Sequence, residues 1–157
     1  MEEKMYYFQG KQYPLIFRVN RSAEKTIVDW NGESFICECS EASKKDAAKA
    51  LKAFYMKSCR KLIDKRLRKY QPDFNVKYRS FKIDGSIKKW GSCSSDRHLI
   101  FNWRLVMLPV QIIDYVVVHE LCHLVHMNHD RSFWRLVGKV YPDYKKAEAY
   151  MSRIRIV

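Results

Sequence analysis

The stretch VVVHELCHLVHMNHD, Val116 to Asp130, contains four of the five histidines of the chain. Within it, His119, Glu120 and His123 form the pattern HExxH. Residues at positions i and i+4 of a helix share one face, with Cβ atoms about 5 to 6 Å apart. Two imidazoles at this spacing converge on one zinc ion, and a glutamate one position round reaches the open side of the metal. The pattern predicts one zinc ion per chain, bound by both motif histidines, with Glu120 as the general base.

The expected chemistry is hydrolysis of a peptide bond. Zinc lowers the pKa of a bound water toward neutrality, and a carboxylate beside the metal can take the remaining proton and later pass it to the leaving amine. The alternative is that the motif histidines are core residues bonded to backbone or to carboxylates. The surrounding segment is so apolar that two histidines and a glutamate would be costly to bury without a metal or another partner. We therefore favour the zinc site.

A catalytic zinc usually takes three protein ligands and leaves a fourth position open. The candidates for the third ligand are His126 and His129. His126 is in helical register, about 10.5 Å of rise beyond His119, and three ligands along one straight helix surround an ion poorly. Asn128 tolerates the left-handed conformation that ends many helices, so a turn there would bring His129 back over the motif. We predict His129 as the ligand and interpret His126 as a group that supports a ligand or faces the substrate.

The motif belongs to a helix that begins at Pro109, where the missing N–H of proline costs nothing. The side chains of this helix are apolar nearly all round, so we expect it to be buried in the centre of the fold. A strand over Arg97 to Leu105 precedes it. Two helices follow it, from Ser132 to Val140 and from Pro142 to Ile154.

The N-terminal part, residues 6 to 42, is predicted to form short strands, at Tyr13 to Val19, Thr26 to Trp30 and Ser34 to Cys39. Asn31 and Gly32 lie between the last two strands, and both tolerate the positive φ of a type I′ hairpin turn. We therefore expect a β-meander here.

A long helix follows, with Ser43 as its N-cap, and ends before Pro72. Two further strands are predicted, at Asn75 to Ile83 and Ile87 to Trp90. The order strands, helix, strands, helices is typical of an α+β fold. We expect a single domain over residues 1–157, divided into N-terminal strands (1–42), a basic helix (43–71) and a catalytic core (75–157).

The charge of the chain is strongly positive. The formal net charge is +13, and residues 44 to 70 carry eleven Lys or Arg against two Asp, a net +9. Such a helix is either a solvated face or a surface for nucleic acid or an acidic partner, and the sequence leaves both open.

The composition predicts a cytoplasmic protein that does not enter a membrane. No apolar run approaches the roughly 20 residues that span a bilayer, and acidic residues stand where a signal peptide needs basic ones. Five cysteines, an odd number, fit a reducing compartment better than a disulfide framework.

The sequence resembles the YgjP-like zinc metallopeptidases, which are related to the SprT-like proteases. Its matching runs are WGSCSS (90–95), LIFNWRLVMLP (99–109), YVVVHELCHL (115–124), MNHD (127–130) and FW (133–134). The resemblance implies a compact zincin-like domain, with the active-site helix under a mixed sheet. It also implies zinc on both motif histidines and on the histidine of an NHS element, which corresponds to His129. That element reads NHD here, and we expect the Asp130 carboxylate to be a hydrogen-bond partner of the ligand beside it.

The resemblance also gives the strand over residues 99–105 a function, because zincins pair an edge strand above the active-site helix with the extended substrate. Asn102 or Arg104 would then line the approach. The alternative is that this strand is internal and belongs to the core. The group that stabilises the oxyanion together with zinc is left open among Tyr115, His126 and Arg104.

Two other functions remain as alternatives to a zinc-dependent metallopeptidase acting on proteins or peptides. A metal-dependent nucleotide phosphohydrolase would fit the positive charge, although no Gly-rich phosphate loop is visible and the ligands suit zinc better than magnesium. A nucleic-acid-docking module would use the helix over residues 44–70 and carry the zinc site.

Overall fold

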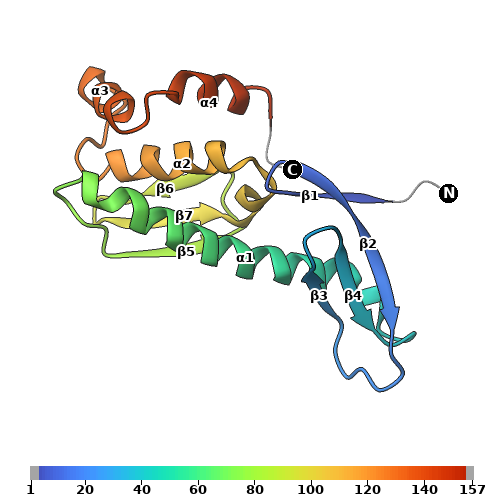
Figure 1. Cartoon of the computed structure of the whole chain (residues 1–157). Helices are drawn as coiled ribbons and strands as arrows, with labels where there is room; N and C mark the ends of the chain where they lie inside the picture. Colours follow the sequence, from blue (N-terminus) through green and yellow to red (C-terminus); the bar gives the residue numbers. More distant parts are fainter. Residues whose placement is uncertain (1–3, 155–157) are drawn as a thin grey trace.

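The computed structural model describes residues 4–154, which form an α+β fold (Figure 1). One of its two sheets has three strands, in the order β5 (Ser80–Asp84), β7 (His98–Asn102) and β6 (Gly91–Cys93). β5 runs parallel to β7, and β6 runs antiparallel to it. The sheet is therefore mixed, as the family resemblance implies.

Two helices, α1 (Ala47–Tyr70) and α2 (Val110–Cys122), cover one face of this sheet. α1 contacts β5, α2 contacts β6, and the two helices contact each other (Figure 1). The alternation along β7 fits this arrangement, because Leu99 and Phe101 are buried while His98 is exposed. The apolar face of the central strand is thus the face that the helices cover.

The helix α2 is enclosed by its neighbours, as its apolar sequence predicts. Ten of its thirteen residues are buried. α3 (Arg131–Val140) and α4 (Tyr144–Met151) pack on the side of α2 away from the sheet (Figure 1). The last helix is thus shorter than the predicted span over 142–154. None of the helices within residues 4–154 has both the length and the apolar character needed to cross a membrane.

The strand predicted over residues 97–105 ends at Asn102, and a 3-10 helix, η3 (Trp103–Met107), follows it. The Asn102 side chain starts this helix, because its Oδ1 accepts a hydrogen bond from the Arg104 N–H at 3.0 Å. β7 lies between β5 and β6, so the expectation that residues 99–105 form an edge strand is wrong. The alternative prediction, that this strand is internal and belongs to the core, is confirmed.

The loop before β6 depends on the same asparagine. Asn102 is fully buried, and its Nδ2 donates to the carbonyls of Ile87 and Lys89, both at 3.3 Å. The predicted strand over residues 87–90 is therefore an irregular segment, and the strand begins only at Gly91.

The second sheet contains the N-terminal strands, in the order β1-β2-β4-β3: β1 (Met5–Phe8), β2 (Lys11–Val19), β4 (Phe35–Cys39) and β3 (Ile27–Trp30). β2 pairs with β4 in parallel, so the predicted β-meander is wrong. The physical reason is burial. Phe35, Cys37 and Cys39 of β4 have no exposed surface, which favours the interior position for β4 and leaves β3 at the edge.

The predicted hairpin between β3 and β4 is confirmed, although its turn is longer than a two-residue type I′ turn. Trp30 pairs with Phe35, which leaves four residues in the loop. Gly32 has a φ of 98°, and Asn31 keeps a negative φ. The Asn31 Oδ1 instead accepts from the N–H groups of Glu33 and Ser34, at 2.9 and 2.8 Å, and closes the loop.

The long basic helix is confirmed, although α1 begins only at Ala47, and Ser43 precedes a 3-10 turn, η1 (Lys44–Asp46), without a side-chain capping bond. A buried ion pair attaches α1 to α2. Arg66 Nε and Nη2 donate to the two carboxylate oxygens of Asp114, both at 2.6 Å, and the Tyr70 hydroxyl donates to the same carboxylate at 3.0 Å. The Asp114 side chain is 9% exposed and that of Arg66 17%. This bidentate contact therefore gives the Asp114 carboxylate a cationic partner, without which its burial in α2 would be costly.

Arg66→Met should lower the free energy of unfolding by roughly 3 to 5 kcal/mol, because it leaves a buried carboxylate without its cation. Urea unfolding followed by circular dichroism measures this loss. The control is Arg68→Met, which removes an exposed pair with Asp64 and should cost less than about 1 kcal/mol. Equal losses in the two variants would show that the buried pair contributes no more to the free energy of unfolding than the exposed pair.

Candidate metal centre

Three histidine side chains converge at the end of α2. His129 Nε2 lies 3.2 Å from His119 Nε2 and 3.1 Å from His123 Nε2. One nitrogen from each ring lies within 4.8 Å of the others, and the group could hold a metal ion. The structure thus brings together the three predicted ligands, and it places His126 outside this group.

The convergence depends on where α2 ends. The helix stops at Cys122 and His123 is its C-cap, so residues 124–130 return across the end of the helix. The expectation that His126 stays in helical register is therefore wrong. Asn128 does not adopt a left-handed conformation, since Gln9 and Arg97 are the non-glycine residues with positive φ within 4–154. The chain reverses earlier than predicted, and this reversal still brings His129 next to His119 and His123.

His126 contributes to the site through its backbone. Its carbonyl oxygen lies 3.0 Å from His123 Nδ1. Donation from Nδ1–H to this carbonyl leaves the lone pair of His123 on Nε2, the nitrogen that faces the other two rings. The carbonyl therefore orients the ligand and selects its tautomer.

Burial keeps the two motif histidines in the neutral form that binds metals. Desolvation, together with the nearby His123 and His129, lowers the pKa of His119 to about 3. Burial also lowers the pKa of His123. Both imidazoles are therefore unprotonated near neutral pH, with lone pairs available to a cation.

Two aromatic residues at the start of α3 support the rings. Phe133 stacks on His123, with ring centroids 4.5 Å apart, and Trp134 stacks on His129 at 6.1 Å. Asp130 is the N-cap of α3, because its Oδ1 accepts from the Phe133 N–H at 3.0 Å. The expectation that this carboxylate bonds to the adjacent ligand is therefore replaced by a capping role. Phe133 and Trp134 form one of the sequence runs that carry the family resemblance. Their contacts with the histidines could not be predicted from any local sequence pattern.

Glu120 lies on the buried side of α2, 5% exposed, against strand β6. A Cβ atom at Gly91 would lie 3.0 Å from both Cγ and Oε2 of Glu120, so a larger residue there would push the Glu120 side chain out of its present position. Burial raises the pKa of Glu120 to about 8, and the positive charge of Lys89 opposes this shift. The sequence singled out Gly91 only as part of the WGSCSS run, and its contact with Glu120 was not expected, because the contact joins residues far apart in the chain.

A cavity of about 210 Å³ lies beside this carboxylate, lined by Trp90, Gly91, Tyr115, His119, Glu120, Glu148 and Met151 among others. The Tyr115 hydroxyl is 3.5 Å from His119 Nδ1, so this side chain both lines the cavity and contacts a ligand. Trp90 also borders a larger cavity, of about 580 Å³, and Arg104 lines that one. Arg104 and the buried Asn102 thus do not line the cavity beside Glu120, whereas Tyr115 lines it and contacts His119.

Comparison with known proteins identifies the family of the chain. The sequence matches the family model described as YgjP-like, metallopeptidase domain, over residues 1–154, which makes the chain a metallopeptidase. It belongs to the YgjP-like family. The crystal structure of the metallopeptidase zymogen abylysin from Pyrococcus abyssi is similar, with a TM-score of 0.47 and 22% identity, over 63% of this chain and 99% of that one. No curated protein matches the sequence.

Metal content should separate the two histidines that follow the motif. His129→Ala removes an imidazole from the cluster and should abolish stoichiometric metal binding after dialysis. His126→Ala keeps the carbonyl that orients His123 and should retain the metal. Elemental analysis of the purified variants measures this, with His98→Ala on the far side of the sheet as a control. Retention in the His129 variant together with loss in the His126 variant would overturn the assignment.

Proposed function

We propose that the chain is a zinc-dependent peptidase in which His119, His123 and His129 hold one zinc ion and Glu120 is the general base. The observation that carries the proposal is the geometry of the histidine cluster. Zinc–nitrogen bonds of about 2.0 to 2.1 Å at tetrahedral angles place ligand nitrogens about 3.3 Å apart. The cluster has two such separations, of 3.1 and 3.2 Å. Three imidazoles are also a donor set that suits zinc.

When bound, zinc acts as a Lewis acid and lowers the pKa of a coordinated water. The Glu120 carboxylate takes a proton from the attacking water and returns it to the leaving amine. Its burial makes it a stronger base than an exposed glutamate, which suits proton transfer near neutral pH. The Tyr115 hydroxyl and the His126 carbonyl hold the two motif imidazoles in place.

An extended substrate would pair with the free edge of β6, and not with residues 99–105, because β7 is internal and β6 is an outer strand. β6 is an outer strand of the three-stranded sheet, it contacts α2, and it begins at Gly91 beside Glu120. A peptide that adds to this edge would pass its backbone across the cavity next to the carboxylate. Protein or peptide substrates also follow from membership in a metallopeptidase family, and this favours peptide bonds over nucleotides.

Glu120→Gln should keep the metal and lose peptide hydrolysis by about 10²-fold or more, because the amide cannot accept the proton. Cleavage of an unfolded protein, followed by electrophoresis, measures the activity, and elemental analysis measures the metal. Unchanged turnover would remove Glu120 from the mechanism. Loss of the metal as well would mean that the variant no longer tests proton transfer.

Gly91→Ala should lower kcat while the three histidines still bind metal, because the added methyl meets the Glu120 side chain at 3.0 Å. The expected loss is on the order of 10-fold or more, since misplacing a general base reduces proton transfer steeply. Steady-state kinetics with a quenched peptide, together with metal content and the thermal midpoint, measures the effect. Full activity in a folded variant would show that Glu120 does not depend on this glycine.

A further inference from the structure

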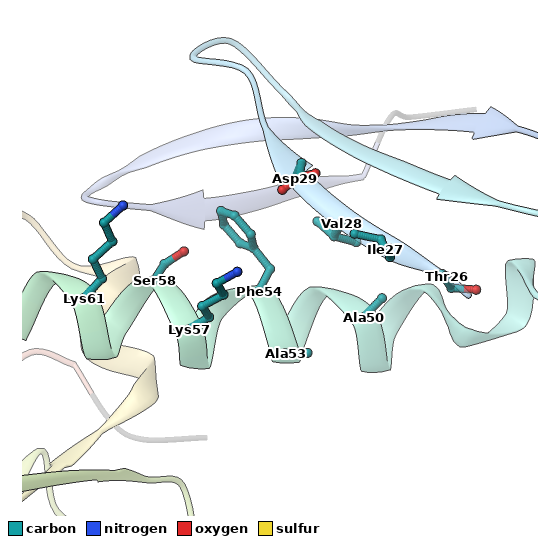
Figure 2. Close-up of a pocket in the computed structure, with 10 residues that line it drawn as sticks. All are labelled: Thr26, Ile27, Val28, Asp29, Ala50, Ala53, Phe54, Lys57, Ser58 and Lys61. Atoms are coloured by element: carbon teal, nitrogen blue, oxygen red, sulfur yellow. The ribbon is translucent and has the colours of Figure 1, made fainter. Parts of the chain in front are cut away.

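A groove runs between the edge strand β3 and the helix α1 (Figure 2). Its first part is a cavity of about 370 Å³ between residues 26–29 and the helix side chains Ala50, Ala53, Phe54, Lys57, Ser58 and Lys61. A second cavity, of about 430 Å³, shares several of these residues and extends along the helix to Lys65. We call the two together the β3–α1 groove. None of its lining residues lines the cavity beside Glu120.

The strand side of the groove has backbone groups available for pairing. β3 is the last strand of its sheet and pairs with β4 alone. Because the Asn31 N–H bonds to the Ser34 carbonyl, the alternation of an antiparallel pair directs the N–H and C=O groups of Val28 and Trp30 away from β4. An edge of this kind is a template for another strand.

The helix side of the groove leaves room for such a strand. Ala50, Ala53 and Ser58 are small and line the groove, and Figure 2 shows Ala50 and Ser58 on the side of α1 toward β3. A strand added to β3 would lie about 4.7 to 4.9 Å from it. The exposed Ile27 side chain, 53% accessible, would gain an apolar neighbour.

The charge of the groove is positive. Lys57, Lys61 and Lys65 follow each other at four-residue intervals, so they form a row along one side of α1. All three are exposed, and none takes part in an ion pair with the residues 4–154 that the structure describes. Asp29 is the carboxylate residue that lines both cavities. The row therefore favours an anionic ligand.

We propose that the β3–α1 groove binds an extended, acidic polypeptide segment as an added strand on β3, with its carboxylates next to Lys57, Lys61 and Lys65. A polypeptide fits better than a DNA strand, because the strand edge offers both donors and acceptors. A phosphodiester backbone supplies acceptors only and would leave the carbonyls of Val28 and Trp30 unpaired. The proposal does not depend on the metal centre.

The test is binding of a labelled peptide of alternating valine and glutamate, measured by fluorescence anisotropy at low salt. The triple charge reversal Lys57→Glu, Lys61→Glu, Lys65→Glu should weaken binding about tenfold or more. Ala53→Trp fills the groove without changing the charge and should weaken it similarly. The matched control is Lys45→Glu, Lys49→Glu, Lys52→Glu, which changes the same charge on exposed residues outside the groove and should alter affinity less than about threefold.

Other outcomes would overturn the proposal. Equal weakening in the control triple variant would mean non-specific attraction by the basic helix. Unchanged binding by Ala53→Trp, which keeps the wild-type charge, would place the peptide elsewhere. Equal affinity for a peptide N-methylated at alternate residues would exclude strand addition. Tighter binding of a single-stranded oligonucleotide of equal charge would assign the groove to nucleic acid, and no binding at low salt would remove it as a site. Thermal unfolding of each variant verifies the fold.

Discussion

The burial of α2 is the constraint on which the rest of the structure depends. In a helix as enclosed as α2, a polar group without a partner is costly to bury. Asp114 meets Arg66 and Tyr70 from α1. Both motif histidines contact His129. The loop that carries His129 and the helix that follows it pack against the end of α2. The elements that pack around α2 therefore supply both the core and the contacts of the site.

The basic helix α1 has different functions on different sides, although its charges look alike in the sequence. Arg66 points inward and neutralises a carboxylate of α2, so α1 supports α2 from this side. Lys57 and Lys61 lie on the groove side, beside β3. A net charge of +9 on one helix is therefore a sum of unlike contributions, and only the charges without an ion pair within residues 4–154 are available to an anionic ligand.

The part of the candidate site that depends on spacing within one helix could be predicted from the sequence. The interval between His119 and His123 places two rings on one face of any helix. His129 was identified from the need for a reversal, although the helix ends at Cys122, earlier than expected. The contact between Gly91 and Glu120 could not be predicted in this way, because it arises from packing between β6 and α2. The same holds for the ring contacts of Phe133.

The N-terminal sheet shows how a wrong detail of topology bears on function. Sequence patterns identified its strands and the β3–β4 hairpin, but not the parallel pairing of β2 with β4, since that pairing follows from how much each strand can bury. In a meander, β3 would lie between two strands and its backbone groups would be paired. Because the more apolar β4 takes the interior position, β3 keeps a free edge directly beside the lysine row of α1. The preference that builds the core of this sheet is thus also what leaves the β3–α1 groove open.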